Sequence, residues 1–91
     1  MSDKNDANMD DNIYKITSPI MGTFYHSSTP GEPPLIKVGQ KINSSEIVCV
    51  IESMKIFTQI RSEHACIVKE ILVENEEPVM KKQDIITIEK E

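Results

Sequence analysis

Apolar and polar residues alternate in short runs along most of this chain. From residue 13 onward, runs rich in isoleucine and valine recur about every ten residues and are separated by turn-forming residues such as Gly, Pro, Asn and Ser. This pattern is typical of β-strands joined by short loops. It predicts strands at residues 13–17, 46–52, 55–62, 66–73 and 84–90. The one stretch with a helical appearance is interrupted by Pro78, so the chain is predicted to be all-β.

Residues 1–12 break this pattern. They are polar and acidic and have no apolar period, which predicts a flexible tail followed by one domain over residues 13–91. The net charge of −5 argues against nucleic acid and against an anionic membrane surface, because both bind basic faces. No apolar run approaches the roughly 20 residues that span a bilayer. We therefore expect neither nucleic-acid nor membrane partners.

The predicted strands belong to an internal repeat. Residues 36–52 resemble residues 73–89 at an offset of 37, and residues 16–25 resemble residues 60–69 at an offset of 44. The first half therefore carries about seven extra residues after Phe24, in HSSTPGEPP, where Gly and Pro favour a protruding loop. A two-fold repeat would place the junction of the halves at one pole and both termini at the other.

The junction of the two halves raises a chemical question. In VIESMKIFTQI, residues 50–60, two predicted strands meet at Met54-Lys55 without the Gly, Asn, Asp or Pro of a tight reversal. The local sequence offers Lys55 no desolvated pocket, so Schiff-base or general-base chemistry is disfavoured. Lys55 is therefore either an ordinary surface lysine or an amine that another enzyme acylates.

The other reactive side chains indicate no catalytic or metal site. Cys49 and Cys66 form no C-x-x-C pair, and the apolar surroundings of Cys49 indicate a buried thiol, with a disulfide as the alternative. His26 and His64 are far apart in the sequence. No triad, phosphate loop or carboxylate pair can be identified. We therefore do not expect the chain to be an enzyme in its own right.

The sequence around Lys55 resembles a known family. ESMKIFTQI is similar to the biotin-attachment motif, usually Glu-Ala-Met-Lys followed by apolar residues. The segments SPIMGTFY, KVGQKIN, IVCVIESMK and VKEILVENEEPV follow the family's spacing over about residues 13–90. The chain thus resembles the biotinyl domains of the biotin carboxyl carrier proteins of acetyl-CoA carboxylase.

This resemblance implies a fold, a cofactor and a set of site residues. The family fold is a flattened β-barrel of two four-stranded antiparallel sheets with pseudo-two-fold symmetry. A biotin protein ligase would join biotin by an amide to Lys55, in an attachment hairpin at about residues 50–58. Glu52, Ser53 and Met54 match the flanking positions, which present the lysine to the ligase and to partner enzymes. For Glu52, a plain solubilising charge is the alternative.

The extra loop of the first half also has a counterpart in the family. There it forms a thumb that packs near the biotin ring, which here corresponds to about residues 27–34. The resemblance aligns Ser27 with a thumb hydroxyl that can hydrogen-bond the ureido group of biotin. An ordinary loop serine is the alternative.

The implied function is that of a swinging carrier. Biotin carboxylase would carboxylate the biotin ring, and carboxyltransferase would then use that carboxyl group to form malonyl-CoA for fatty acid biosynthesis. Tethering raises the effective concentration of the reactive group at both enzymes. The domain itself would catalyse nothing. Bacterial cytoplasm is expected rather than plastid stroma, because no transit peptide is visible.

Some residues depart from the family pattern and leave alternatives open. Ser53 replaces the usual alanine, and Glu-Ser-x-Lys also occurs in lipoyl-bearing H proteins. Ala65 and Cys66 stand at an expected turn where the family often has glycine, so a positive φ there would cost stability. The alternatives are a biotin carrier of another carboxylase or of a decarboxylase, a lipoyl carrier domain, or an interaction module whose Lys55 is never modified.

Overall fold

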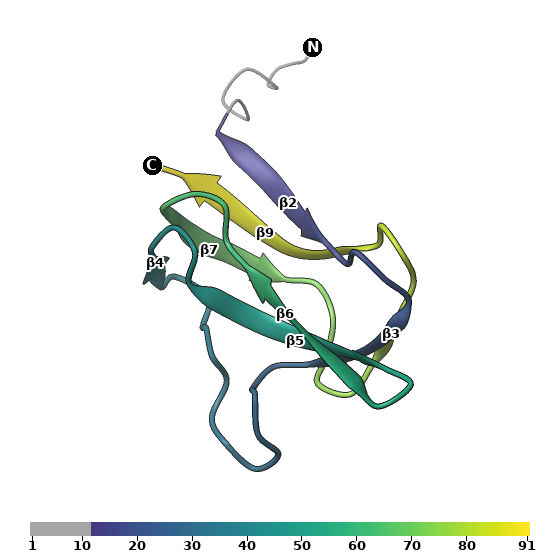
Figure 1. Ribbon diagram of the computed structural model, residues 1–91. Helices are drawn as coiled ribbons and strands as arrows, with labels where there is room; N and C mark the ends of the chain where they lie inside the picture. The colour runs from purple at the N-terminus through teal and green to yellow at the C-terminus, as the bar shows by residue number, and fades with distance from the viewer. Residues whose placement is uncertain (1–11) are drawn as a thin grey trace.

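A computed structural model describes residues 12–91, which form eight β-strands. The strands are β2 (Ile13–Thr17), β3 (Gly22–Tyr25), β4 (Lys41–Ile42), β5 (Ile47–Ser53), β6 (Ile56–Arg61), β7 (Cys66–Ile71), β8 (Pro78–Val79) and β9 (Asp84–Lys90). They form two antiparallel four-stranded sheets with the orders β2-β9-β7-β4 and β6-β5-β3-β8 (Figure 1). The predicted all-β class and the two-sheet architecture are confirmed.

Most of the predicted tail, residues 1–11, lies outside the described residues. Asn12, the last residue of that tail, accepts a hydrogen bond from the Lys90 N–H at 2.7 Å. Residues 12–91 contain no helix with the length and hydropathy that a membrane crossing requires.

The same topology occurs twice, once in each sheet. A shift of 44 residues carries β2 and β3 onto β6 and β7, and a shift of 37 residues carries β4 and β5 onto β8 and β9. These shifts turn one sheet order into the other. Each sheet therefore contains two strands from each half of the chain, and the repeat seen in the sequence is a structural pseudo-two-fold.

The repeat extends to the backbone details. The register shifts between Ile16 and Thr17 where β2 pairs with β9, and at the equivalent step, Ile47/Cys49, where β5 pairs with β6. The buried residues Ser18 and Ser62 are also equivalent, and each Oγ donates a 2.6 Å hydrogen bond to the carbonyl oxygen two residues later. These bonds satisfy polar groups that would otherwise be buried without a partner where β2 and β6 end.

The hydrophobic core lies between the two sheets and draws on both. Its largest fully buried apolar side chains are Phe24, Ile42, Ile51, Ile85, Ile86, Val48, Val68 and Val79. Cys49 and Cys66 are free and also belong to this core. The prediction that Cys49 is a buried thiol is confirmed.

The backbone at Ala65 and Cys66 does not meet the condition under which these residues would cost stability. Neither residue has a positive φ, and Cys66 begins β7. Left-handed backbone occurs elsewhere, at Glu76, where φ is 68°. The repeat makes Glu76 equivalent to Gly39, whose φ is 91°, so one half uses glycine for this turn and the other half does not.

Gly22 permits the close approach of β3 to β5. A Cβ at this position would overlap the carbonyl oxygen of Glu52 and would lie 2.9 Å from Cγ2 of Ile51. A side chain would therefore push β3 away from the end of β5. Gly22 thus lets β3 hold β5 in place just before the chain reverses.

Alkaline pH should destabilise the domain through Cys49. Burial raises the pKa of the Cys49 thiol from 9.0 to about 12. The unfolded chain loses this proton at lower pH than the folded chain does. The contribution of this thiol to the free energy of unfolding is therefore fully present below about pH 9. It falls by about 1.4 kcal/mol per pH unit between pH 9 and pH 12. We expect the free energy of unfolding to fall less between about pH 8 and about pH 10.5 in Cys49→Val than in the wild type, as measured by urea unfolding. An unchanged slope would assign the loss to other groups.

Candidate functional site

β5 and β6 form a hairpin whose two loop residues are Met54 and Lys55. Ser53 pairs with Ile56 at its end, and φ is 52° at Met54 and 68° at Lys55. Positive φ at both loop residues is the requirement of a type I′ turn, which usually recruits Asn-Gly. A left-handed φ costs an ordinary L-residue roughly 1–2 kcal/mol. The hairpin therefore carries strain in order to keep two long side chains at its tip.

Both side chains of the turn are exposed to solvent. Met54 is 90% exposed, and Lys55 is also exposed. The tip lies at one end of the molecule, whereas β2 begins and β9 ends at the other (Figure 1). The sequence repeat predicts this arrangement, with the junction of the two halves at one pole and the termini at the other. Lys55 is thus accessible to a partner that approaches from the end remote from Asn12.

Glu52 holds the backbone of the turn. Its Oε2 accepts a hydrogen bond from the Lys55 backbone N–H at 2.7 Å. An ionised acceptor makes such a bond stronger than one between neutral groups. Glu52 therefore holds the main chain of the turn at Lys55.

Removing this bond should loosen the tip. We expect Glu52→Ala to lower the free energy of unfolding by about 1 kcal/mol, because the Lys55 N–H loses its intramolecular acceptor. Glu52→Gln keeps a side-chain oxygen as acceptor and should lose less than half as much. Urea unfolding of both variants makes the comparison. Equal losses would show that the charge of Glu52 matters rather than its hydrogen bond.

A loop between β3 and β4 projects beside this hairpin (Figure 1). The Leu35 N–H donates a hydrogen bond to the His26 carbonyl oxygen at 2.7 Å, so residues 27–34 leave and return at one point. The His26 N–H donates to Asn75 Oδ1 at 3.0 Å, which ties the base of the loop to the β7–β8 connection. The closed segment comprises residues 27–34, which are predicted from the sequence to form a thumb.

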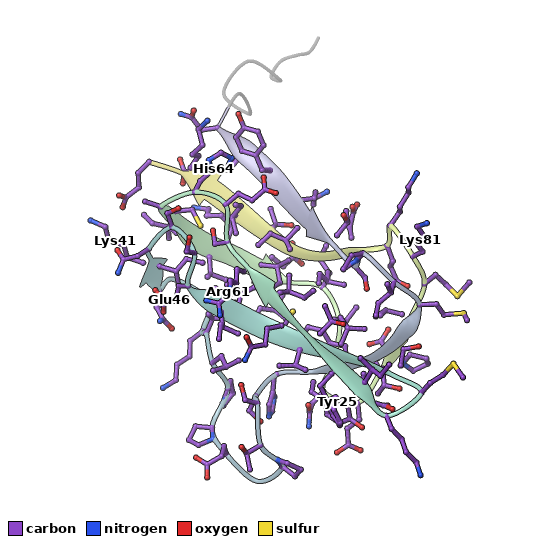
Figure 2. The ribbon with its side chains drawn as sticks, in the orientation of Figure 1. Tyr25, Lys41, Glu46, Arg61, His64 and Lys81 are labelled. Atoms are coloured by element: carbon purple, nitrogen blue, oxygen red, sulfur yellow. The ribbon has the colours of Figure 1, made fainter. Side chains whose placement is uncertain are left out.

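A recess of about 190 Å³ lies between this loop and β6. Its lining residues are Tyr25, Ser27, Ser28, Pro30 and Phe57. The Tyr25 and Phe57 rings lie 6.2 Å apart between centroids, at 41° (Tyr25 is labelled in Figure 2). Ser27 is largely buried, and its Oγ donates a 2.9 Å hydrogen bond to the Thr29 carbonyl oxygen. The recess thus combines aromatic walls with hydroxyl groups. One of its walls, Phe57, is two residues after Lys55 in the sequence.

Tyr25 and Phe57 were not predicted as site residues from the sequence. Phe57 did carry a signal, since an aromatic ring two residues after an exposed tip is costly to expose without a use. Tyr25 carried none, because its contact with Phe57 joins residues that are far apart in the sequence.

A larger groove lies away from the hairpin tip. It measures about 490 Å³ and runs between β2 and the far part of β6, with the apolar side chains of Ile16, Ile60 and Ile88 among its lining residues. At one end the Tyr14 and His64 rings lie 5.8 Å apart between centroids.

Among residues 12–91, no three His, Cys, Asp or Glu side chains are grouped as metal ligands would be.

Comparison with known proteins gives concordant findings. A family model described as "Biotin-requiring enzyme" matches residues 14–88. The chain is 45% identical to biotin carboxyl carrier protein of acetyl-CoA carboxylase 1, chloroplastic, from Arabidopsis thaliana, over 70% of this chain and 23% of that protein. It is 39% identical to the biotin carboxyl carrier protein of acetyl-CoA carboxylase from Nostoc sp., over 88% of this chain and 44% of that protein. The chain therefore spans less than half of each of these two relatives.

A solved structure shares the fold. A single-chain, multi-domain long-chain acyl-CoA carboxylase superposes on 89% of this chain and on 8% of its own, with a TM-score of 0.76 and 14% identity. At that identity the match concerns the fold alone. The family model covers most of the chain and includes the hairpin with Lys55, and the resemblance seen in the sequence is confirmed: the chain belongs to the biotin-requiring enzyme family.

Proposed function

We propose that this domain carries biotin as an amide on Lys55. The observation that carries the proposal is the hairpin tip, where a strained turn without Gly or Asn places an exposed lysine amine at the end of a rigid sheet. The turn geometry would accept Asn-Gly at lower cost, so the retained Met54-Lys55 pair calls for a functional reason. The names of the relatives supply one, since both are biotin carriers.

The carried group transfers a carboxyl unit between two enzymes. Biotin carboxylase loads the biotin, and carboxyltransferase unloads it to acetyl-CoA, as the relatives' association with acetyl-CoA carboxylase supports. The domain supplies attachment, orientation and a high local concentration of the group, and it performs no bond-making step itself. When bound, biotin provides the ring nitrogen that holds the carboxyl group.

The recess beside the hairpin fits the ring of biotin. Tyr25, Pro30 and Phe57 offer apolar surface to the fused rings, and Ser27 offers a hydroxyl oxygen for the ureido edge. The Ser27 proton is already donated to the Thr29 carbonyl oxygen. Its oxygen lone pairs stay available to accept from a ureido N–H. Ser27 is therefore assigned the role of an acceptor for the carried ring.

The cellular compartment stays a prediction. The relatives include a chloroplast protein and one from Nostoc sp.. We propose bacterial cytoplasm, with plastid stroma as the alternative that the chloroplast relative keeps open.

Intact-mass spectrometry tests the proposed function. The domain is incubated with biotin, ATP and a biotin protein ligase, and in parallel with lipoate, ATP and a lipoate ligase. We expect one biotinyl increment, mapped to Lys55 by peptide sequencing, and no lipoyl increment. A folded chain that gains a lipoyl group alone would reassign it to the lipoyl carriers. A folded chain that gains neither group would refute covalent carriage on Lys55.

A further inference from the structure

Three methionines line the end of the molecule that presents Lys55. Gly22 pairs with Val79 in β3–β8, and Thr23 pairs with Glu52 in β3–β5. Continuing both antiparallel registers by one or two residues places Met21 beside Met80 on one side and beside Met54 on the other. Figure 2 shows sulfur atoms along this end of the molecule, in yellow at the right of the view. The three side chains form a row across β8, β3 and the tip of β5, which we call the methionine row.

The methionine row is apolar surface turned toward solvent. Met21, Met54 and Met80 are 60%, 90% and 62% exposed. Ile56 and Phe57, on the returning strand, are also mostly exposed and extend the apolar surface next to Lys55. Flexible, polarisable methionine side chains suit surfaces that adapt to a partner. A contiguous apolar patch at one end of a small domain indicates a binding site.

The pseudo-two-fold shows that the fold does not require these residues. The equivalents of Met21 and Met54 at the other end are Ala65 and Glu91. The turn Met80-Lys81-Lys82-Gln83 corresponds to Asn43-Ser44-Ser45-Glu46, in which φ of the third residue is 73° against 70° at Lys82. In both turns the first N–H donates to the fourth side chain, at 2.8 Å and 2.9 Å. The same turn therefore forms with Asn-Ser-Ser in place of Met-Lys-Lys.

Two positive charges follow the methionine row directly along the chain. Net charge is −5, yet the exposed lysines Lys81 and Lys82 follow Met80 directly, and Lys81 lies on the right-hand side of Figure 2, the side on which the hairpin also turns. Within residues 12–91, the ion pairs use Lys15, Lys41 and Lys69 and none of the lysines at this end. Exposed lysines without an internal carboxylate leave their charge for a partner.

We propose that the methionine row together with Lys81 and Lys82 is the surface by which the enzyme that acylates Lys55 docks, and that this enzyme presents carboxylates around an apolar recess. This proposal rests on the proposed function, because it assumes that Lys55 is modified. The apolar row supplies contact area beside the reacting amine. The lysine pair steers the acidic face of the enzyme toward it and sets the orientation.

The test measures kcat/KM for biotin transfer with the biotin protein ligase of the same organism. One variant replaces the turn by its internal equivalent, Met80→Asn/Lys81→Ser/Lys82→Ser, and so keeps a backbone that the fold already uses. The control, Lys37→Ser/Val38→Asn/Lys41→Ser, removes the same charge and an apolar side chain of equal exposure, since Val38 and Met80 are both 62% exposed. Lys41 lies at the opposite end from Lys81 (Figure 2).

We expect kcat/KM to fall about tenfold or more in the first variant at low salt and to stay unchanged in the control. Added salt should lower the wild-type value and leave the first variant unaffected.

A second readout separates this proposal from the function on which it rests. Methyl-labelled methionine in a Lys55→Arg domain reports ligase binding without turnover. We expect the Met21, Met54 and Met80 signals to broaden when ligase is added. A response of all three methionines without biotin transfer to the wild-type chain would keep the docking surface and refute biotin carriage. Two results together would refute the docking surface and keep biotin carriage. These are full-rate transfer to the Met80–Lys82 variant, and Met21 and Met80 signals in the Lys55→Arg domain that do not change when ligase is added.

Discussion

Lys55→Arg will abolish biotin attachment and leave the free energy of unfolding unchanged. Attachment needs a primary amine as nucleophile, and a guanidinium keeps the charge but not that nucleophile. The side chain is exposed at the tip of the β5–β6 hairpin, and the hydrogen bond from residue 55 to Glu52 uses the main chain. Arginine therefore preserves both the turn and its support. Mass spectrometry after ligase treatment measures the first effect, and urea unfolding measures the second.

A lysine outside the hairpin and the docking surface provides a matched control for this result. Lys37→Arg keeps the charge of an exposed residue and should retain full attachment. Biotin on the Lys55→Arg chain would move the site to another lysine and would refute the assignment made from the hairpin. A large fall in unfolding midpoint would show instead that the Lys55 side chain has a packing role, which its exposure does not predict.

Phe24→Ala will remove most of the stability of the domain, about 3–5 kcal/mol. Phe24 is 2% exposed and lies in β3, in the core cluster between the two sheets. Truncation leaves a cavity among isoleucine and valine side chains that cannot collapse fully. A domain of this size has a small margin, because a short chain buries a limited fraction of its surface. We therefore expect a variant that is close to unfolded at physiological temperature.

Phe57→Ala is the internal control, because Phe57 is the same residue type at 61% exposure. We expect its cost to stay below about 1 kcal/mol, since little area returns to water. Urea unfolding of both variants, with the slope m compared, reports the change in stability. Equal losses for the two phenylalanines would mean that Phe57 packs as tightly as Phe24 and that the recess beside residues 27–34 is closed in solution.

The longer strands could be predicted because their apolar runs are strong local signals. Residues 13–17 and 84–90 form the predicted strands, and the three other predicted strands differ from the structure only at their ends. The repeat offsets also located the equivalence of the two sheets. β3, β4 and β8 were not predicted as separate strands from the pattern. Two of them have only two residues, and such strands are defined by their partners rather than by a period of their own.

The candidate site divides in the same way between local and long-range information. The Met54-Lys55 tip could be located because turn chemistry is local, and the absence of Gly or Asn there pointed to strain that the positive φ values bear out. The hydrogen bond from Lys55 to Glu52 depends on a rotamer, which no sequence pattern specifies. The recess required Tyr25 and Phe57 to meet across two strands. The methionine row required the register of three strands, because its members are 26 to 59 residues apart in the sequence.

The interleaving of the two halves also fixes when the domain can be completed during synthesis. β2 emerges first from the ribosome, but it pairs with β9, which emerges last and lies inside its sheet. The sheet that supports Lys55 likewise needs β8, which is translated after the hairpin. Pairings that span so much of the chain form slowly and late. A nascent chain that already displays Lys55 therefore lacks the surface around it, and an enzyme that reads this surface acts only on finished domains.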